Sequence, residues 1–270
     1  MRRVLSSILA AALVATTPLF AGSSLIRLTD RDDLFGWEAV GKVEIGNNSY
    51  CTGALIAPNL VLTAAHCVYD GARQVQPGEM RFRAGLRDGK FIEERRVARL
   101  VAHSGYINGA VLSANSIRHD AALLELEQAI PSAVASPFVL AGQSGKGQRV
   151  SVVSFGRGRD NALSWQRDCG ITGKGQGLMS FDCNVTFGSS GAPVFMRENG
   201  RARIVSLISS GGKREGGTIA YGMVLPEIVD RLKRDLRAMP RASSTVKVRR
   251  VQIGQGGTAS GAKFAKPIEN

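Results

Sequence analysis

The sequence contains few residues of the kind that form metal centres. Among its 270 residues are only 3 histidines and 4 cysteines, and no two cysteines have the C-x-x-C spacing common in zinc sites. The apolar run near the start, residues 4–13, is too short to span a bilayer. We therefore expect no metal, no cofactor and no membrane span in the mature chain.

Acidic residues are also scarce relative to basic ones. The chain has 22 Asp and Glu against 35 Lys and Arg, a formal charge of +13, and loss of Arg2 and Arg3 would lower this to +11. Such a charge attracts acidic surfaces, including nucleic acid, lipid head groups and lipopolysaccharide, without selecting one. The basic residues are scattered and no nucleic-acid-binding motif is present, so we expect no specific nucleic-acid partner.

Residues 1–23 are typical of a signal peptide. Arg2 and Arg3 precede the apolar run, and the small residues of 16–23 follow it, with cleavage expected near residues 21–23. An uncleaved anchor is the alternative. We therefore predict an exported, periplasmic or extracellular protein, which we expect to be a monomer.

In an exported protein the four cysteines can form disulfides, because an oxidising compartment permits them. Four cysteines allow three pairings. The local pairs are Cys51 with Cys67 and Cys169 with Cys183. In the chain-entropy model each would contribute about 3 kcal/mol of stability.

Short apolar runs separated by turn residues indicate an all-β fold, either a closed barrel or a sandwich. Glycine is abundant at 32 residues, which suits many turns better than long helices. A boundary between two halves is expected in residues 130–147, where proline and glycine interrupt the pattern. The predicted strands are 39–45, 51–56, 60–63, 80–84, 93–102, 121–126, 149–155, 179–183, 192–196, 204–209 and 219–224.

The two ends of the mature chain differ from this pattern. Residues 24–36 are polar and are interpreted as a propeptide or an N-terminal arm. Residues 225–239 are the one predicted helix, with apolar side chains on one face, Pro226 in the first turn and Pro240 after the end. Residues 240–270 are basic and rich in glycine, so we expect a mobile tail, although 245–253 could form a short strand.

Three residues could together perform nucleophilic catalysis. Ser190 lies in the glycine-flanked loop 186–193, His66 ends an apolar strand pattern before a cysteine, and Asp120 opens another apolar run. Taken singly, such a histidine is more often structural and such an aspartate more often a turn residue. A serine hydroxyl becomes a nucleophile when a base removes its proton and a third group orients that base.

In the order His, Asp, Ser, and in the segments 63–67 and 188–193, the chain resembles the chymotrypsin-like (trypsin-like) serine endopeptidases. The resemblance covers residues 37–238. It implies two six-stranded antiparallel β-barrels packed together, about 37–135 and 145–224, with a C-terminal α-helix. It also implies a polypeptide substrate that binds in the cleft between the barrels.

The resemblance further implies a role for each residue. Ser190 would attack the scissile carbonyl, His66 would accept and return the proton, and Asp120 would orient the imidazole. The backbone N–H groups of Gly188 and Ser190 would form the oxyanion hole. Ser206 matches the position whose hydroxyl supports the aspartate in this family.

Three departures from the trypsin pattern are visible. Ser189 replaces the aspartate that pairs with a newly cut N-terminus in trypsin zymogens, and no Ile-Val-Gly-Gly start is present, so this activation is not expected. Asn184 and Ile208 are assigned to a shallow specificity pocket, and glutamyl specificity is disfavoured because no histidine follows His119. The second cysteine pair follows a bacterial variant, which points to a bacterial secreted member.

Two other functions remain open. A non-catalytic binding protein on the same scaffold could use the basic surface to dock acidic partners. An esterase is disfavoured, because its serine should precede its aspartate and histidine in the sequence.

Overall fold

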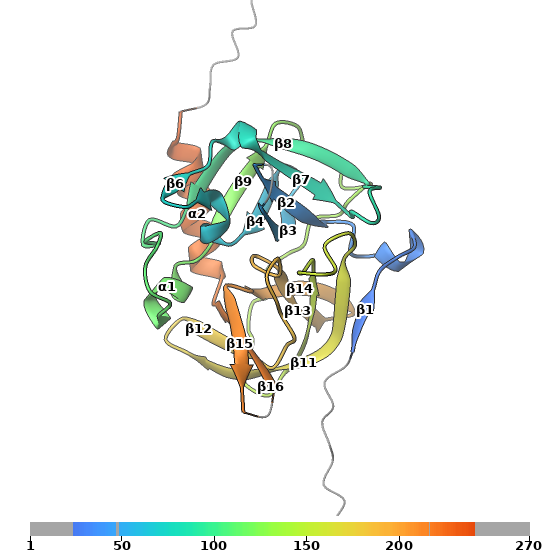
Figure 1. The fold of residues 1–270 in the computed structure, drawn as a ribbon, viewed down its shortest axis with the longest axis vertical. Coiled ribbons are helices and arrows are strands. Elements are labelled where there is room, and N and C mark those ends of the chain that lie inside the picture. Colours follow the sequence, from blue (N-terminus) through green and yellow to red (C-terminus); the bar gives the residue numbers. More distant parts are fainter. Residues whose placement is uncertain (1–23, 47–48, 216, 241–270) are drawn as a thin grey trace, which may run out of the picture. The chain divides into compact units, whose positions relative to one another are not determined.

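The computed structural model describes residues 24–46, 49–215 and 217–240. The predicted signal peptide and the basic tail from residue 241 onwards, including the possible strand at 245–253, lie outside the described residues. Within them the chain is built mainly of strands (Figure 1). No described helix is long and apolar enough to cross a membrane.

The first half of the fold is a closed antiparallel barrel, as predicted. Its strands pair in a ring, so that none of the six has a free edge. Inward-facing side chains such as Val43 and Phe82 are fully buried. In the order of pairing, the strands are β2 (Val40–Ile45), β3 (Ser49–Ala57), β4 (Leu60–Thr63), β9 (Ala122–Leu126), β8 (Glu93–Ala102) and β7 (Met80–Ala84).

The second half is an eight-stranded antiparallel sheet rather than a six-stranded one. The additional strands include the N-terminal β1 (Leu25–Arg27), which pairs with β11. The all-β, two-barrel fold class is confirmed. In the order of pairing, the other strands are β14 (Arg201–Leu207), β13 (Pro193–Glu198), β10 (Arg149–Ser154), β11 (Ser164–Gly175), β12 (Leu178–Phe181), β16 (Gly217–Met223) and β15 (Ser210–Arg214).

Few other elements are present in the described residues. The helix α2 (Pro226–Ala238) agrees with the predicted helix and buries Val229, Leu232 and Leu236. Its carbonyl at Leu236 accepts a hydrogen bond from Arg99 Nη1 on β8 at 3.0 Å, which ties the helix to the barrel. The remaining elements are α1 (Ala114–Arg118), the short pair β5 (Tyr69–Asp70) and β6 (Arg73–Gln74), and the 3-10 helices η1 (Asp32–Leu34), η2 (Ala65–Val68) and η3 (Pro77–Glu79).

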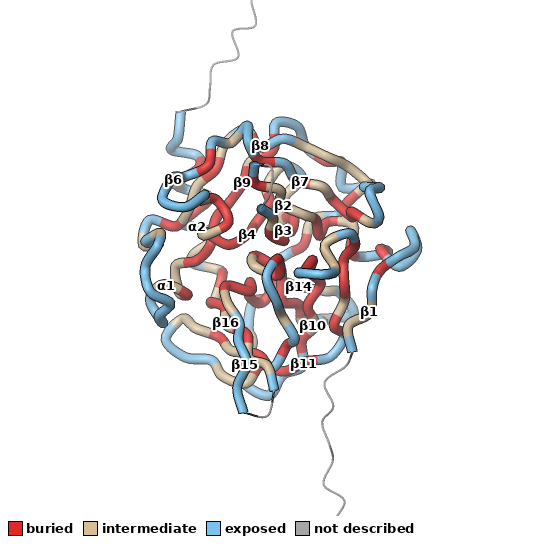
Figure 2. The backbone as a smooth tube through the Cα atoms, viewed as in Figure 1, coloured by how far each residue is buried: buried red, intermediate tan, exposed pale blue. Residues whose placement is uncertain are grey.

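Aromatic side chains connect the two halves through a shared core. The ring of Phe195 on β13 lies 5.0 Å from that of Trp37 and 4.6 Å from that of Phe138. These residues belong to one buried cluster that also contains residues of β2, β3 and α2. Figure 2 shows buried residues in the strands of the first barrel and in those of the second sheet. Burial of this apolar surface holds the two halves in a fixed arrangement.

Residues 24–36 are integrated into the fold as an arm. Beyond β1, Leu28 donates its N–H to the carbonyl of Leu163 at 2.8 Å. Leu34 is fully buried in the shared core, and Leu28 is nearly so. Between them, the carboxylate of Asp33 accepts the N–H groups of Thr29 and Asp30. The arm therefore contributes apolar side chains that the rest of the core would lack without it.

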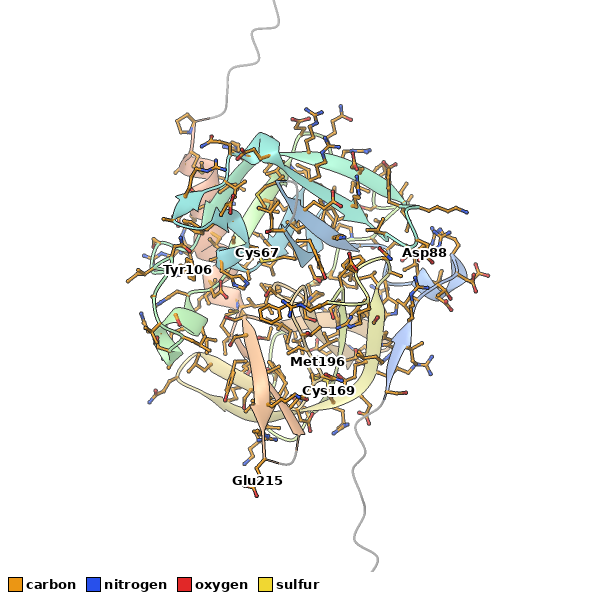
Figure 3. All side chains as sticks on the ribbon, viewed as in Figure 1. Cys67, Asp88, Tyr106, Cys169, Met196 and Glu215 are labelled. Atoms are coloured by element: carbon orange, nitrogen blue, oxygen red, sulfur yellow. A yellow bond between two sulfur atoms is a disulfide. The ribbon has the colours of Figure 1, made fainter. Side chains whose placement is uncertain are left out.

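Both disulfides have the local pairing predicted from the sequence. Cys51 on β3 bonds to Cys67 in η2, and Cys169 on β11 bonds to Cys183 after β12. Cys67 and Cys169 are labelled in Figure 3, in the first barrel and the second sheet respectively. The first bridge fixes the segment that follows β4, where His66 lies.

Candidate active site

The predicted catalytic residues lie together, lining a cleft of about 730 Å³. His66 and Asp120 line it from the first barrel, and Ser190 lines it from the loop before β13. Residues 208–213 form another wall. The three candidates are up to 124 positions apart in the sequence, and the packing of the two sheets makes them neighbours.

Two adjacent strands place His66 beside Asp120. Thr63 at the end of β4 is the register partner of Ala122 at the start of β9. The histidine follows β4 in η2, and the aspartate lies two residues before β9. As a result, His66 Nδ1 lies 2.8 Å from Asp120 Oδ2, and the backbone N–H of His66 donates to Oδ1 at 2.9 Å. These contacts fix the imidazole and indicate the tautomer with its proton on Nδ1.

The environment of His66 favours its charged form. Burial of the ring opposes protonation, but the hydrogen bond that His66 donates to Asp120 and the attraction of the Asp120 charge outweigh burial and raise the pKa of His66 above its ordinary value. Tyr106 lines the same cleft, and burial, together with the charge of Asp120, raises its pKa to about 12. Tyr106 is labelled in Figure 3. Its phenol therefore stays neutral at physiological pH.

Ser209, rather than Ser206, supports Asp120. The Ser209 hydroxyl donates to Asp120 Oδ2 at 2.6 Å, and both residues are buried. Ser206 is still within β14, where its hydroxyl faces β16 and donates to the carbonyl of Met223 at 2.8 Å. The assignment of Ser206 to this role was wrong because β14 ends at Leu207, and only the bend after it turns a hydroxyl towards the aspartate.

Two glycines give the loop around Ser190 its shape. Gly188 and Gly191 have φ of +90° and +74°, a region that other residues rarely adopt. A Cβ at Gly188 would lie 2.4 Å from the ring of Tyr50, and one at Gly191 would lie 2.2 Å from Thr63 Oγ1. Any side chain at these positions would therefore displace the loop from the first barrel.

Thr52, which the sequence did not single out, fixes this loop to β3. Its N–H donates to the carbonyl of Ser190 at 2.9 Å, and its hydroxyl donates to the carbonyl of Gly188 at 2.8 Å. The same oxygen accepts the N–H of Phe155 at 3.1 Å. The side chain is fully buried. Its only sequence signal is its place beside Cys51, since a threonine in a strand is common.

The peptide groups of the loop leave two N–H groups free. The carbonyl of Phe187 accepts the N–H of Arg157 at 2.7 Å, and the carbonyl of Ser189 accepts the N–H of Ala192 at 3.0 Å. Because these peptides are trans, the N–H groups of Gly188 and Ser190 point opposite to those carbonyls. Neither N–H donates to another described residue. Such a pair of oriented donors can stabilise an oxyanion.

The two residues assigned to the specificity pocket both line the cleft. Ile208 is only 2% exposed, whereas Asn184 is exposed and donates its N–H to Gln166 Oε1 at 2.7 Å. Val185, which was not singled out from the sequence, lines the same cleft. A Cβ on Gly211 would lie 2.4 Å from Val185 Cγ2. Val185 therefore packs directly against the opposite wall, on β15.

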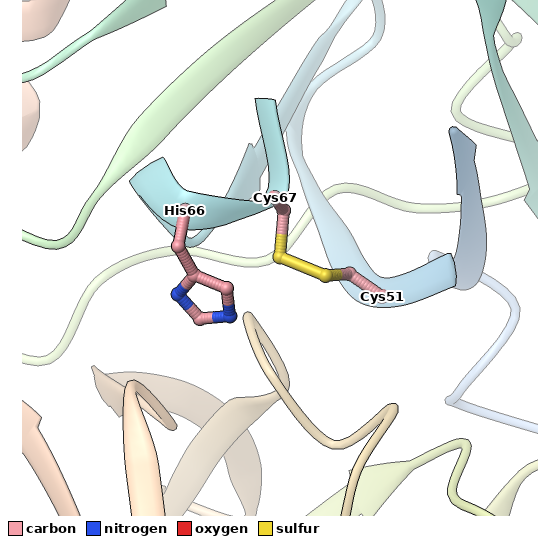
Figure 4. A group of neighbouring side chains, drawn as sticks. All are labelled: Cys51, His66 and Cys67. Atoms are coloured by element: carbon pink, nitrogen blue, oxygen red, sulfur yellow. A yellow bond between two sulfur atoms is a disulfide. The ribbon is translucent and has the colours of Figure 1, made fainter. Parts of the chain in front are cut away.

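The cysteines beside His66 are not available as thiolate ligands. Cys51, His66 and Cys67 lie close together, as Figure 4 shows, but the two sulfur atoms are joined in the disulfide. The same holds for Cys169 and Cys183 beside Asp182. Zinc binds the deprotonated thiolate of cysteine, so these two clusters do not provide a thiolate metal site.

The known proteins that this chain resembles in sequence are described as peptidases or serine proteases. A family model described as a trypsin-like peptidase domain matches residues 51–203. Serine protease SP24D of Anopheles gambiae is 32% identical over 170 residues, covering 56% of this chain and 60% of its own length. Serine protease 23 of Bos taurus is 30% identical over 172 residues, covering 54% and 44% respectively. The chain thus spans 60% or less of these curated relatives.

Solved structures share the fold at low sequence identity. A Glu endopeptidase, solved in complex with MPD, has a TM-score of 0.64 at 20% identity and covers 80% of this chain and 98% of its own. Protease Anisep from Arthrobacter nicotinovorans has a TM-score of 0.60 at 16% identity and covers 75% and 96%. At these sequence identities, the similarity shows that the fold is shared.

Proposed function

Because this chain belongs to the trypsin-like peptidase family, whose model matches residues 51–203, we propose that it is an exported serine endopeptidase that uses Ser190, His66 and Asp120. The observation that carries the proposal is the Asp120–His66 hydrogen bond in a cleft that Ser190 also lines. Two disulfides fit an oxidising compartment outside the cytosol.

The first half of the reaction forms an acyl-enzyme. Ser190 Oγ attacks the peptide carbonyl while His66 Nε2 takes the hydroxyl proton, and the resulting imidazolium is stabilised by the carboxylate of Asp120. The carbonyl oxygen becomes an oxyanion, to which Gly188 and Ser190 donate their N–H groups. His66 then delivers its proton to the leaving amine as the C–N bond breaks.

The second half returns the enzyme to its starting state. Water attacks the acyl carbonyl, His66 accepts a proton from the water, and the same two N–H groups again bind the oxyanion. Collapse of this intermediate breaks the ester bond and returns the proton to Ser190 Oγ. Throughout, Asp120 holds the imidazole in place and itself accepts a hydrogen bond from the hydroxyl of Ser209 at 2.6 Å.

We also propose that small aliphatic side chains fit best beside Ser190. Support comes from Val185, which contacts the opposite wall of the cleft at Gly211, and from the buried Ile208. Cleavage of a diverse peptide library would measure this preference. Predominant cleavage after Arg or Lys would refute the assignment of Asn184 and Ile208 to the pocket.

Hydrolysis of casein tests the proposed activity. The wild type should release peptides, Ser190→Ala should lose activity by several orders of magnitude, and the exposed-site control Ser132→Ala should match the wild type. Equal hydrolysis by wild type and Ser190→Ala would contradict the mechanism. Absence of hydrolysis, combined with salt-sensitive binding to acidic surfaces, would favour the non-catalytic alternative.

A further inference from the structure

Ser189, the neighbour of the proposed nucleophile, lies in a fully buried polar pocket. Its hydroxyl donates to the carbonyl of Phe155 at 3.1 Å and lies 3.2 Å from the hydroxyl of Ser154. It also accepts the N–H of Thr186 at 3.3 Å. A hydroxyl with these partners is held in one orientation, so the pocket fixes the residue directly before Ser190.

A partly buried guanidinium completes this pocket. Arg159 Nη2 donates to the hydroxyls of both Ser189 and Ser154 at 3.2 Å, and Nη1 donates to the carbonyl of Ser154 at 2.7 Å. A Cβ on Gly156 would lie 2.7 Å from the guanidinium carbon, so the group packs flat against a glycine. Among the described residues, no carboxylate forms an ion pair with Arg159.

This arrangement differs from an ordinary surface arginine. Burial lowers the pKa of Arg159, with the phenol oxygen of Tyr50 acting in the opposite direction. A guanidinium nonetheless stays charged in proteins. A charge held partly out of water by neutral oxygens alone costs stability, and a cost of this kind suggests that the contacts serve a purpose at the nearby site.

The segment held by Arg159 contacts the loop that carries the oxyanion donors. Arg157 donates its N–H to the carbonyl of Phe187, which sets the peptide of the Gly188 N–H. Phe155 donates to the hydroxyl of Thr52, which in turn holds the carbonyl of Gly188. Movement of residues 154–159 would therefore turn both peptide groups that flank Gly188.

The N-terminal arm leads away from this pocket. Arg27, Ile26 and Leu25 pair in turn with Ser164, Trp165 and Gln166 of β11, so each step towards the N-terminus moves further from Arg159 along that strand. Figure 1 shows β1 at the outer edge of β11. Among the described residues, the partners of the Ser189 hydroxyl all lie outside the arm.

We propose that Arg159 is a positioning residue, which anchors Ser189 and thereby holds Gly188 and Ser190 in the conformation needed for catalysis without a contribution from the N-terminal amine. The inference rests on the proposed protease function. It assigns to an internal side chain the role that a new N-terminus plays in trypsin zymogens, and it makes the site competent whether or not residues precede the arm.

Variants of Arg159 in the full chain test the proposal. Arg159→Met keeps most of the length and removes every donor, and Arg201→Met on the exposed end of β14 is the matched control. Arg159→Met should lower kcat at least about tenfold, approaching the roughly 10²–10³-fold loss seen when one oxyanion donor is removed. The KM should change less than about twofold, and Arg201→Met should match the wild type.

Chemical rescue separates positioning from a general loss of structure. Millimolar guanidinium should restore part of the kcat of Arg159→Ala and leave the wild type and Arg201→Met unchanged. If Arg159→Met does not fold, Arg159→Lys takes its place, with an expected loss in kcat at nearly constant KM. A wild-type kcat in Arg159→Met would overturn the proposal. If Arg159→Lys has to be used instead, a wild-type kcat in that variant, together with no rescue of Arg159→Ala by guanidinium, would overturn it.

A non-cleavable extension placed before Ser24 tests independence from the N-terminal amine. The extended chain should hydrolyse peptides at the wild-type rate, and activity that appears only after removal of the extension would overturn the inference. An active wild type with an equally active Arg159→Met would refute this inference alone. A wild type without activity in any form would instead refute the proposed function on which it rests.

Discussion

Ser209→Ala removes one donor from a buried carboxylate and leaves the three proposed catalytic side chains in place. Asp120 is 3% exposed and accepts from Ser209 at 2.6 Å, in addition to its two contacts with His66. A hydrogen bond to a charged group contributes about 1.5–3 kcal/mol. If the lost hydrogen bond raises the free energy of the transition state by this amount, kcat/KM falls by about tenfold to 150-fold.

Ser206→Ala is the matched control. Ser206 is just as buried, but its hydroxyl donates to the carbonyl of Met223 and does not contact Asp120. We expect a stability loss of about 1 kcal/mol with kcat/KM within about twofold of the wild type. The assay is hydrolysis of a chromogenic peptide by both variants, with urea unfolding measured in parallel. An equal loss of activity in the two variants, or full activity in Ser209→Ala, would contradict the assignment of Ser209 as the residue that supports Asp120.

The remaining predictions concern the imidazole, the arm and one disulfide. Asp120→Asn should lower kcat by about 10⁴-fold. Because it removes both contributions that raise the pKa of His66 and leaves burial, NMR titration should give a pKa below the ordinary value, and an unchanged pKa would contradict the assigned cause. The acid limb of the wild-type pH–rate profile should correspondingly lie above the 6.5 of a free histidine, because activity requires the neutral ring. Leu34→Ala should lower the free energy of unfolding by about 2–5 kcal/mol, measured in urea, and a loss below 1 kcal/mol would show that the arm is dispensable. Replacement of Cys51 and Cys67 by alanine should cost about 3 kcal/mol for a separation of 16 residues, and unaltered thermal stability would contradict this.

Strands with an apolar or alternating pattern could be predicted from the sequence, three of them to the residue and the others with ends shifted by one to three residues. The runs 60–63, 80–84 and 93–102 coincide with β4, β7 and β8, because side-chain burial in the barrel imposes the pattern that the sequence displays. The residues of the proposed triad were also identifiable, since short motifs surround two of them. Of the three pairings that four cysteines allow, the structure has the local one named from the sequence.

Elements held by backbone contacts were missed. β11 contains Gln166, Arg167 and Asp168 in succession, yet it pairs with β1, β10 and β12 through its main chain. β15 contains two glycines and two basic residues and is a strand because it pairs with β16. Neither stretch has the apolar periodicity from which a strand is predicted.

The supporting polar residues of the site depend on contacts between distant positions. Thr52 contacts Gly188 across 136 positions, and Ser209 contacts Asp120 across 89. Small hydroxyl residues are common in strands and bends, so nothing local distinguishes these two from Ser206. Only the packing of the two halves shows which hydroxyl is aimed at the carboxylate.

In the proposed mechanism, Ser190 is a nucleophile activated by His66. Peptide mass spectrometry after incubation with a fluorophosphonate tests it most directly, since the reagent bonds to an activated serine. We expect one adduct on Ser190, none on the neighbouring Ser189, and no adduct in Ser190→Ala or His66→Ala. An adduct on a different residue, or undiminished labelling of Ser190→Ala, would contradict it.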